Sequence, residues 1–366
     1  MGSYSDFEID LLRVAELIGA ASVAFALLLS LVVLMLRARL LLRERRCRTF
    51  LSFWQPILMN AVEVASSDVP QLWRRDLSNF LLLWNHLHES LLDESKDHLN
   101  QIAYALSIDQ TALRMLRRGN LRERLMAMNT LGHLREQKAW DDLSQITEGD
   151  DAFVSLAAAR ALVMIDAGKA VSQLIPLLTS RRDWTAARVA SVLQIAGADV
   201  LSDPIARAAI ALSLEQTTTV ADHEAEAINQ AARLVQYLEL AHNASALPAA
   251  HRIAVSSHDP EVLAACLRLL SRAEDLDIIR DCLRHEDWRV RVQAAVALGR
   301  VGEAEDEARL IPLLSDKQWW VRYRAAQGLS HLPSMRETRL TAIQAEQSNP
   351  FARDMLAQVM AEIQLQ

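Results

Sequence analysis

A repeated motif in the last third of the chain constrains its fold more than any other feature. The motif is a Val-Arg pair followed by two Ala and one Leu at helical spacing. It occurs at Val290, Arg291, Ala294, Ala295 and Leu298, and again 31 residues later at Val321, Arg322, Ala325, Ala326 and Leu329. An echo lies 136 residues upstream, where the order Leu-Ile-Pro-Leu-Leu of residues 310–314 is also found at residues 174–178. Recurrence in separate segments predicts a chain built of repeated helical units.

The spacing within the motif explains why such units must stack. Val290, Ala294, Ala295 and Leu298 fall at i, i+4, i+5 and i+8, which places them on one narrow apolar stripe of a helix. One helix pair cannot bury its apolar faces alone, so about three units are needed for stability. Aromatic residues make up only 5% of the chain, which favours helices over strands. The predicted fold class is an all-α superhelix.

The motif resembles HEAT repeats, in which a leucine-rich helix with a central Pro, a turn with Asp and a Val-Arg-x-x-Ala-Ala-x-x-Leu-Gly helix form one unit. The closest kind is the short bacterial repeat related to those of phycobilisome lyases. The resemblance covers residues 110–366 and is weak at 199–250, where longer helices are expected. It implies antiparallel helix pairs that stack into a curved solenoid, with the second helices lining a concave face. Turn acids and the arginines that follow them, Asp287 with Arg291 and Asp316 with Arg322, are expected to form a ladder between turns.

An uncharged run of 20 residues from Leu17 to Leu36 predicts a transmembrane helix. At 1.5 Å per residue it is about 30 Å long, which matches the hydrocarbon thickness of a bilayer. A buried core helix is seldom apolar on every face over five turns. A cleaved signal peptide is disfavoured because acidic residues precede the run, whereas a signal peptide begins with positive charge.

A cluster of six arginines follows the apolar run: Arg37, Arg39, Arg43, Arg45, Arg46 and Arg48. Positive charge stays on the cytoplasmic side, so the N-terminus is predicted outside and the body in the cytosol. The predicted parts are a short extracytoplasmic N-terminus (1–16), the transmembrane helix (17–36), a basic juxtamembrane segment with a helical neck (37–109), and the solenoid (110–366). Because only four of the 39 basic residues are Lys, the predicted location is a bacterial inner membrane. Trp54 is expected at the membrane surface, where its amphipathic ring fits.

The charge distribution bears on the class of partner. Residues 1–50 contain seven Arg and five acidic residues, and the remaining 32 basic and 41 acidic residues give the body a net charge of −9. Binding to nucleic acid depends on neutralising phosphates, so no nucleic-acid partner is expected. The three cysteines, Cys47, Cys266 and Cys282, have no spacing typical of a disulfide framework or a zinc site.

The sequence contains no recognisable catalytic or cofactor motif. His86 and His88 are two residues apart, which on a helix directs them to different faces. A zinc-binding HExxH motif, a phosphate-binding loop and a nucleophile elbow are all missing. The expectation is therefore no catalysis, no metal, no cofactor and no small-molecule substrate. The alternative, a lyase-like or cofactor-binding repeat enzyme, stays open because HEAT-like folds also include phycobilin lyases and certain DNA glycosylases.

The expected partner is another protein. In the 136-residue register Trp184 and Arg188 correspond to Trp320 and Arg324, with Tyr323 nearby. Trp, Tyr and Arg dominate protein interfaces, so these five residues are the candidate contact set. Each Trp can instead pack between neighbouring units, and that alternative also stays open. The predicted function is a scaffold or adaptor for a membrane-associated protein, with envelope or exopolysaccharide assembly as the hypothesis for the pathway.

Overall fold

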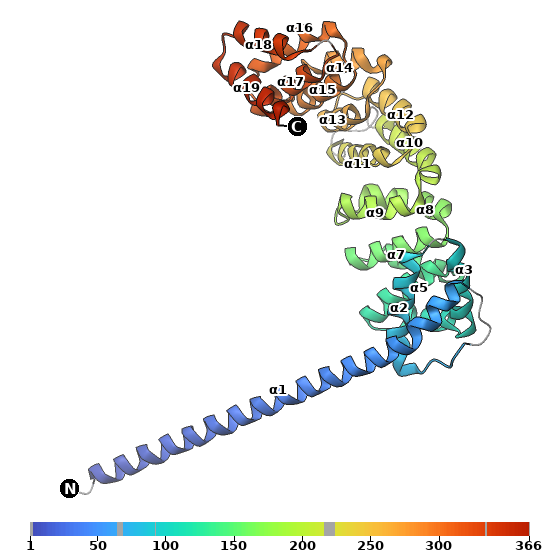
Figure 1. The fold of residues 1–366 in the computed structure, drawn as a ribbon, viewed down its shortest axis with the longest axis vertical. Coiled ribbons are helices and arrows are strands. Elements are labelled where there is room, and N and C mark those ends of the chain that lie inside the picture. The colour runs from blue at the N-terminus through green and yellow to red at the C-terminus, as the bar shows by residue number, and fades with distance from the viewer. Residues whose placement is uncertain (1–2, 64–68, 92, 216–223, 334, 366) are drawn as a thin grey trace. The chain divides into compact units, whose positions relative to one another are not determined.

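The protein is entirely helical in the part of the chain that the structure describes. The computed structural model describes residues 3–63, 69–91, 93–215, 224–333 and 335–365, and no strand occurs in these ranges (Figure 1). The chain divides into two compact units, Met1–Thr130 and Leu131–Gln366. The all-α prediction is confirmed, whereas the sequence-based boundaries at residues 16, 36 and 109 stay predictions.

The first unit consists of one long helix and a small helical bundle. Its helices are α1 (Ser3–Glu63), α2 (Leu77–Ser90), α3 (Asp93–Ala105), α4 (Ile108–Arg118) and most of α5 (Leu121–His133). The last part of α1 packs on α2 and α3. Its buried residues, Phe50, Trp54, Leu58 and Ala61, recur every three or four positions and therefore form one stripe.

Trp54 lies inside this bundle. Its side chain is buried and meets Phe80 of α2 edge to face, with ring centroids 5.1 Å apart. Trp84 is fully buried beneath the same bundle, and its indole N–H donates a hydrogen bond of 3.0 Å to the carbonyl of Leu99. The prediction that Trp54 rests at the membrane surface is wrong, because α2 supplies an apolar partner for the ring.

The stretch of α1 from Phe25 to Leu42 has a different character. Every large apolar side chain that the structure describes between Phe25 and Leu42 is exposed, and these side chains occupy all faces of the helix. Within the described residues, no helix is long and apolar enough to cross a membrane. The predicted transmembrane segment, 17–36, falls partly outside them, because the side chains of residues 17–24 and 26 are not described. The transmembrane helix therefore stays a prediction.

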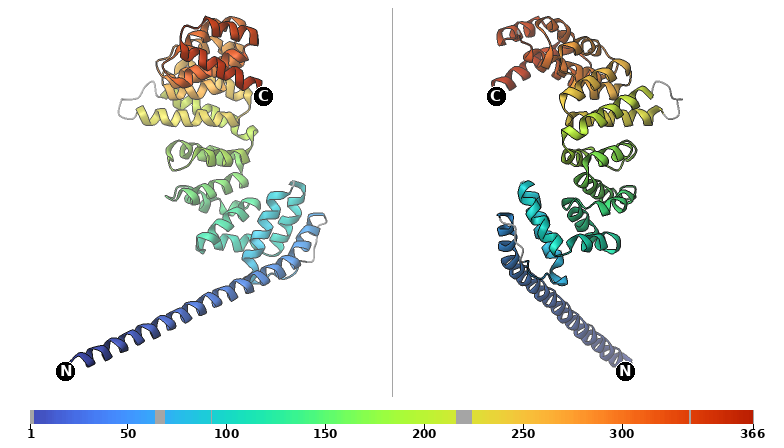
Figure 2. Two further views of the ribbon diagram at one scale, coloured as in Figure 1. Left: turned by 60° about the vertical axis from the view of Figure 1, so that its left-hand side comes forward. Right: turned by 90° about the vertical axis from the view of Figure 1, so that its right-hand side faces the viewer.

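The second unit is a stack of helix pairs in two layers (Figure 2). The pairs are α6 (Trp140–Thr147) with α7 (Ala152–Ile165), α8 (Ala167–Ser180) with α9 (Ala186–Ala196), α10 (Ala198–Glu215) with α11 (Glu224–Tyr237), α12 (Asn243–Ser256) with α13 (Pro260–Leu269), α14 (Leu276–Cys282) with α15 (Trp288–Val301), α16 (Glu307–Leu310) with α17 (Trp319–His331), and α18 (Glu337–Glu346) with α19 (Pro350–Gln364). The odd-numbered helices line the inner side of this curved unit (Figure 1). This arrangement is a helical solenoid, as predicted.

Local sequence signals place several of these helix boundaries. Asn349 caps α19, where its side chain accepts a hydrogen bond of 3.0 Å from the N–H of Phe351, and Pro350 occupies the first helical position. The predicted final helix is therefore confirmed. The weak segment 199–250 contains α10, which at 18 residues is longer than its neighbours, as the sequence also predicted.

Small residues bring α15 and α17 very close together. Ala294, Ala295 and Ala325 are fully buried between the helices of the two motifs. A Cβ atom added to Gly299 would lie only 2.7 Å from the Cα of Gly328, so the two backbones nearly touch. The alanine and glycine positions of the repeat motif therefore set the separation of the inner helices.

Ion pairs connect successive turns of the solenoid. The guanidinium of Arg291 donates to both carboxylate oxygens of Asp316, at 2.8 and 3.0 Å, so the predicted ladder is confirmed at this step. Arg280 makes the same two-point contact with the buried Asp306, also at 2.8 and 3.0 Å. Asp287 departs from the prediction because it caps α15 and pairs with Arg289. The ladder is a structural feature of the repeats.

The Asp306 carboxylate is stabilised in its charged form. Burial alone would raise its pKa, but hydrogen bonds from the guanidinium of Arg280 and the backbone N–H of Glu303 outweigh burial and lower the pKa below its ordinary value. This carboxylate therefore stabilises the folded state as an anion.

Candidate partner-binding surface

An exposed group of aromatic side chains lies where α15 and α17 begin. Trp288 is the first residue of α15, and Trp319 and Trp320 are the first two of α17. Their exposed fractions are 38%, 40% and 52%, whereas large aromatic side chains in soluble proteins are mostly buried. With Tyr323 they form what we call the aromatic cluster. The cluster belongs to the inner layer of helices.

Ring contacts hold the three α17 side chains of the cluster, Trp319, Trp320 and Tyr323, in a defined arrangement. Trp319 and Tyr323 are one helical turn apart, and their rings stack with centroids 5.1 Å apart and an interplanar angle of 12°. Trp320 meets Trp319 edge to face at 4.7 Å. Stacked and edge-to-face arrangements are the favourable geometries of aromatic pairs. The exposed rings are thereby positioned before any partner binds, which reduces the entropy lost on binding.

A polar network fixes Tyr323 from the opposite side. Its hydroxyl donates a hydrogen bond of 2.9 Å to the carboxylate of Glu362 on α19 and accepts one of 2.8 Å from the side-chain amide of Gln327. The hydrogen bond to Glu362 favours the protonated phenol, and burial adds to this effect, so the pKa of Tyr323 is raised. The guanidinium of Arg324 lies over the Tyr323 ring at 5.6 Å and donates to Gln327 at 2.7 Å.

A pocket opens beside the cluster, between α15 and α17. Its volume is about 250 Å³, and the lining residues are Trp288, Val292, Gln293, Val296, Trp320 and Arg324. Trp288, Val292 and Val296 follow one another at four-residue spacing, so they form a single stripe along α15. The space is smaller than the pockets of about 300–1,000 Å³ that enclose drug-sized ligands. It suits one large side chain of a protein partner.

Trp184 does not belong to this exposed surface. Its side chain is only 2% exposed, and its indole N–H donates a hydrogen bond of 2.9 Å to the hydroxyl of Ser155 on α7. The guanidinium of Arg181 covers the ring at 5.4 Å. Trp184 precedes α9, which begins at Ala186, whereas Trp320 lies within α17, so the same register leads to different side-chain directions. For Trp184 the structure favours the packing alternative over the predicted partner contact.

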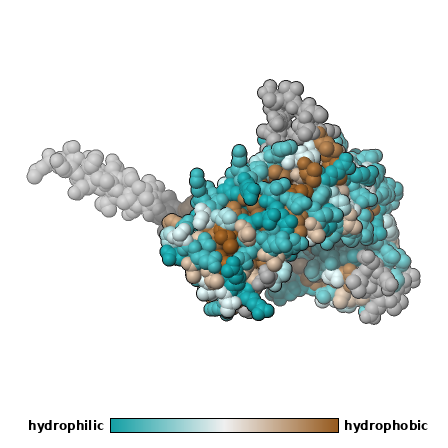
Figure 3. Space-filling view, turned by 90° about the horizontal axis from the view of Figure 1, so that it is seen from above, coloured by the Kyte–Doolittle hydropathy of each residue, from teal (hydrophilic) through white to brown (hydrophobic). Residues whose placement is uncertain are grey.

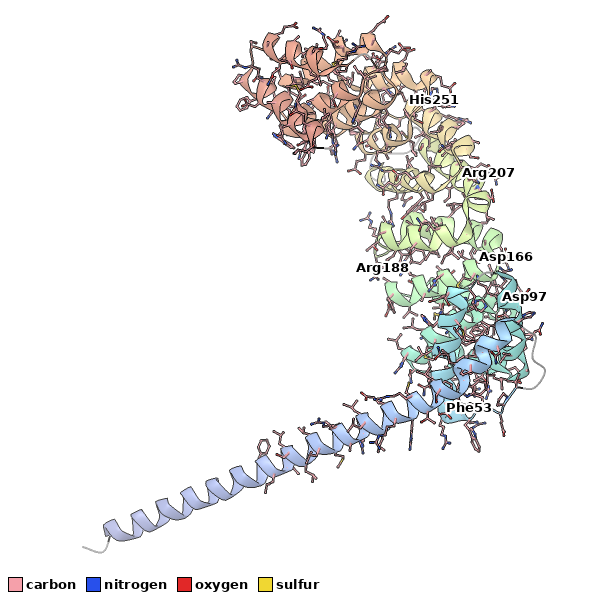
Figure 4. All side chains as sticks on the ribbon, viewed as in Figure 1. Phe53, Asp97, Asp166, Arg188, Arg207 and His251 are labelled. Carbon is pink, nitrogen blue, oxygen red and sulfur yellow. The ribbon has the colours of Figure 1, made fainter. Side chains whose placement is uncertain are left out.

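Arg188 is exposed but lies on another helix, α9. Its guanidinium is 6.0 Å from the ring centre of Phe153, which is itself 56% exposed. Figure 4 shows Arg188 on the inner side of the second unit and Arg207 and His251 on the opposite side. The structure therefore brings together Trp320, Tyr323 and Arg324 and separates them from Trp184 and Arg188. A partner role for each of these residues stays a prediction.

The sequence-based prediction missed the α15 wall of the pocket. In the sequence, Val292, Gln293 and Val296 stand between the buried positions of the motif. In a repeat, such positions face away from the core that the unit forms with its neighbours. The signal was the placement of Trp288, Val292 and Val296 at i, i+4 and i+8 on the helix face beside the motif. Viewed from the end that carries the C-terminal helices, the surface is mostly hydrophilic with a few hydrophobic patches (Figure 3).

Within the described ranges, no three His, Cys, Asp or Glu side chains gather closely enough to hold a metal ion. Cys47, Cys266 and Cys282 are unpaired. Burial raises the pKa of the Cys266 thiol to about 12 and that of Cys282 to about 11, so both thiols are protonated near neutral pH.

Comparison with known proteins places the pocket within a recognised repeat class. A family model described as HEAT repeats matches residues 247–330 and 276–361, which include α15, α17 and the aromatic cluster. The C-terminal part of the solenoid is therefore similar to HEAT repeats over residues 247–361. The narrower resemblance to repeats of phycobilisome lyases stays a prediction.

A solved crystal structure of an engineered protein is also similar to this chain. The two share 17% identity over 84% of this chain and 88% of the engineered one, with a TM-score of 0.35. At that score the likeness carries no argument about function. No curated protein matches the sequence.

Proposed function

We propose that this protein is a scaffold that binds a protein partner through the inner surface of its HEAT repeats. The observation that carries the proposal is the aromatic cluster, because three exposed indole rings lie beside a pocket, and two of them, Trp319 and Trp320, are already held in place by ring contacts with each other and with Tyr323. Trp, Tyr and Arg in such surroundings supply most of the binding energy at protein interfaces. HEAT repeats in general act as scaffolds for protein interaction.

We further propose that α1 anchors the scaffold in a membrane. The support is the exposure of its apolar side chains from Phe25 to Leu42 on every face, because water tolerates such a surface poorly and lipid covers it. The arginines that follow, Arg37, Arg39, Arg45, Arg46 and Arg48, are all exposed, as contact with anionic headgroups requires; the side chain of Arg43 lies outside the described residues.

In this proposal the N-terminus lies outside the bacterial inner membrane and the solenoid on its cytoplasmic face. The partner is then a protein that is itself associated with that membrane. Assembly of the envelope or of an exopolysaccharide stays the hypothesis for the pathway. Nothing in the pocket favours the alternative of a lyase-like or cofactor-binding enzyme, since its lining has one charged group and no nucleophile or acid.

The experiment that tests the scaffold is photocrosslinking in native membranes. A photoreactive residue replaces Trp320 in the full chain, and the captured protein is identified by mass spectrometry. The matched control carries the same residue at Arg207, which is exposed on the opposite side of the second unit (Figure 4). We expect one dominant adduct from position 320 that Tyr323→Ala reduces. Equal capture at both positions, or no adduct from a folded protein, would contradict the proposal.

The anchor is tested separately by extraction. We expect wild-type protein to stay in the membrane pellet after alkaline carbonate, and Leu27→Asp combined with Leu28→Asp to be released. Each acidic residue near the bilayer centre costs about 2.5–3.5 kcal/mol of insertion free energy. Leu82→Asp is the control, because Leu82 is 47% exposed on α2 and lies outside the proposed span. Release of the wild type by carbonate would show that α1 is no anchor.

A further inference from the structure

We infer that the pocket between α15 and α17 recognises a partner segment in which one large apolar residue and one acidic residue stand two positions apart. The inference rests on the proposed scaffold function and adds the chemistry of what the scaffold binds. Two properties of the lining carry it: four of its six residues are Trp or Val, and its Arg324 cation has no anionic partner among the described residues.

The apolar part of the pocket lies along one stripe. Trp288, Val292 and Val296 form one wall, and the indole of Trp320 forms the other. Val292 and Val296 are half-buried on a helix whose opposite face is fully buried, so the repeat core does not use them. A side chain of the size of Leu or Phe fits within the volume of about 250 Å³ and removes part of these surfaces from water. This part of the site selects for an apolar residue.

The charged part of the pocket is Arg324. Its guanidinium is held by Gln327 and by the ring of Tyr323, and no carboxylate of the described residues lies within ion-pair distance of it. Nearby arginines of α15 differ, because Arg289 pairs with Asp287 and Arg291 pairs with Asp316. A positioned guanidinium offers two parallel N–H donors to a carboxylate.

The neighbouring carboxylate does not neutralise this cation. Glu362 accepts the hydroxyl hydrogen of Tyr323 with one oxygen and the amide hydrogen of Gln358 with the other, at 2.9 and 3.0 Å. Both of its oxygens therefore accept hydrogen bonds from neutral donors, Tyr323 of α17 and Gln358 of α19. Among the described residues Arg324 thus has no carboxylate partner, and an acidic residue of a bound segment would supply one.

The spacing of the two features limits the sequence of that segment. Arg324 itself lines the pocket that holds the apolar side chain, so the carboxylate must lie beside that side chain. In an extended peptide, residues i and i+2 lie about 6.5–7 Å apart on the same side of the strand. An acidic residue two positions before or after the apolar one therefore lies on the same side and reaches the guanidinium.

The test selects peptides on the full chain held in a lipid nanodisc, with a phage library of random 12-residue peptides as the probe. The inference expects an enriched pattern of an apolar residue with Asp or Glu two positions before or after it. Three synthetic versions of the selected peptide carry Glu, Gln or Lys at the acidic position. Their binding is measured by fluorescence anisotropy, which gives the contribution of the charge to affinity. We expect Arg324→Gln to weaken binding of the Glu peptide about fivefold, as for a partly exposed ion pair, and to leave binding of the Gln peptide unchanged. Arg324→Glu should bind the Lys peptide in preference to the Glu peptide.

Controls separate the inference from loss of folding and from the proposed function. Arg207→Gln removes an exposed cation from the opposite side and should bind all three peptides as the wild type does. If the selected peptides lack an acidic residue and Trp320→Ala still weakens their binding, the charge inference is wrong and the scaffold function still stands. Equal binding of the Glu peptide to Arg324→Gln and wild type would overturn it likewise. If Trp320→Ala does not weaken binding of the selected peptides, the pocket is not their binding site. Crosslinking at position 320 in native membranes then tests the scaffold function separately.

Discussion

Substitution of the two glycines between α15 and α17 tests whether close backbone contact holds neighbouring helix pairs of the solenoid together. Gly299→Ala adds a Cβ atom that would lie 2.7 Å from the Cα of Gly328, and Gly328→Ala adds one 2.7 Å from the carbonyl oxygen of Ala295. Both obstacles are backbone atoms, which cannot rotate away as a side chain can. The helices must therefore separate, although α17 is tied to α15 by buried alanines on the same face.

The magnitude follows from two opposing effects. Ala is favoured over Gly in a helix interior by about 1 kcal/mol. Carbon atoms prefer a separation of about 3.5–4.0 Å, so a contact of 2.7 Å forces a shift near 1 Å, and overpacking of this kind costs about 1–3 kcal/mol. The lost contacts of the neighbouring alanines add to that cost. We therefore expect each substitution to lower the free energy of unfolding by about 1–2 kcal/mol.

Urea denaturation followed by circular dichroism measures the effect, with the midpoint concentration as the readout. The thermal midpoint should fall by about 2–8 °C for a unit of this size. Gly168→Ala is the matched control, because the nearest atom to its added Cβ is the Asp166 carboxylate at 3.8 Å, and its stability should not decrease. The double variant should lose less stability than the sum of the losses of the two single variants, because both substitutions disrupt the same helix contact. A stable or stabilised Gly299→Ala would refute the reasoning.

Three further predictions concern residues outside this contact. Trp184→Ala should lower the free energy of unfolding by about 3–5 kcal/mol because the ring is buried, whereas Trp320→Ala should change it by less than about 0.5 kcal/mol; urea denaturation distinguishes them. Because the folded-state pKa of Asp306 is lowered, its contribution is present above the unfolded value of about 3.9 and is lost as the pH falls below it. The stability gap between wild type and Asp306→Asn should therefore shrink on acidification from pH 7, and a constant gap would contradict this. Burial raises the pKa of Cys266 to about 12, so iodoacetamide at pH 8 should label the half-buried Cys47 first, and faster labelling of Cys266 by mass spectrometry would be the opposite result.

The repeat motif in the sequence predicted most of the solenoid, because helix pairing depends on periodic local patterns. The stripe of Val290, Ala294, Ala295 and Leu298 is buried as expected, and the turn acid Asp316 joins the ladder. The cap at Asn349 was also readable, since a side-chain acceptor next to Pro350 acts within a few residues. Such features need no knowledge of distant contacts.

The direction of individual aromatic side chains was decided by the tertiary structure alone. Trp184 and Trp320 occupy the same place in the repeat register, yet α9 begins two residues after Trp184 whereas α17 already contains Trp320. The first ring folds back onto Ser155 and the second remains exposed. Trp54, next to the arginines in sequence, is covered by Phe80 from another helix. A periodic sequence determines which face of a helix is apolar, but which neighbour covers a given ring depends on where two helices begin and how they pack.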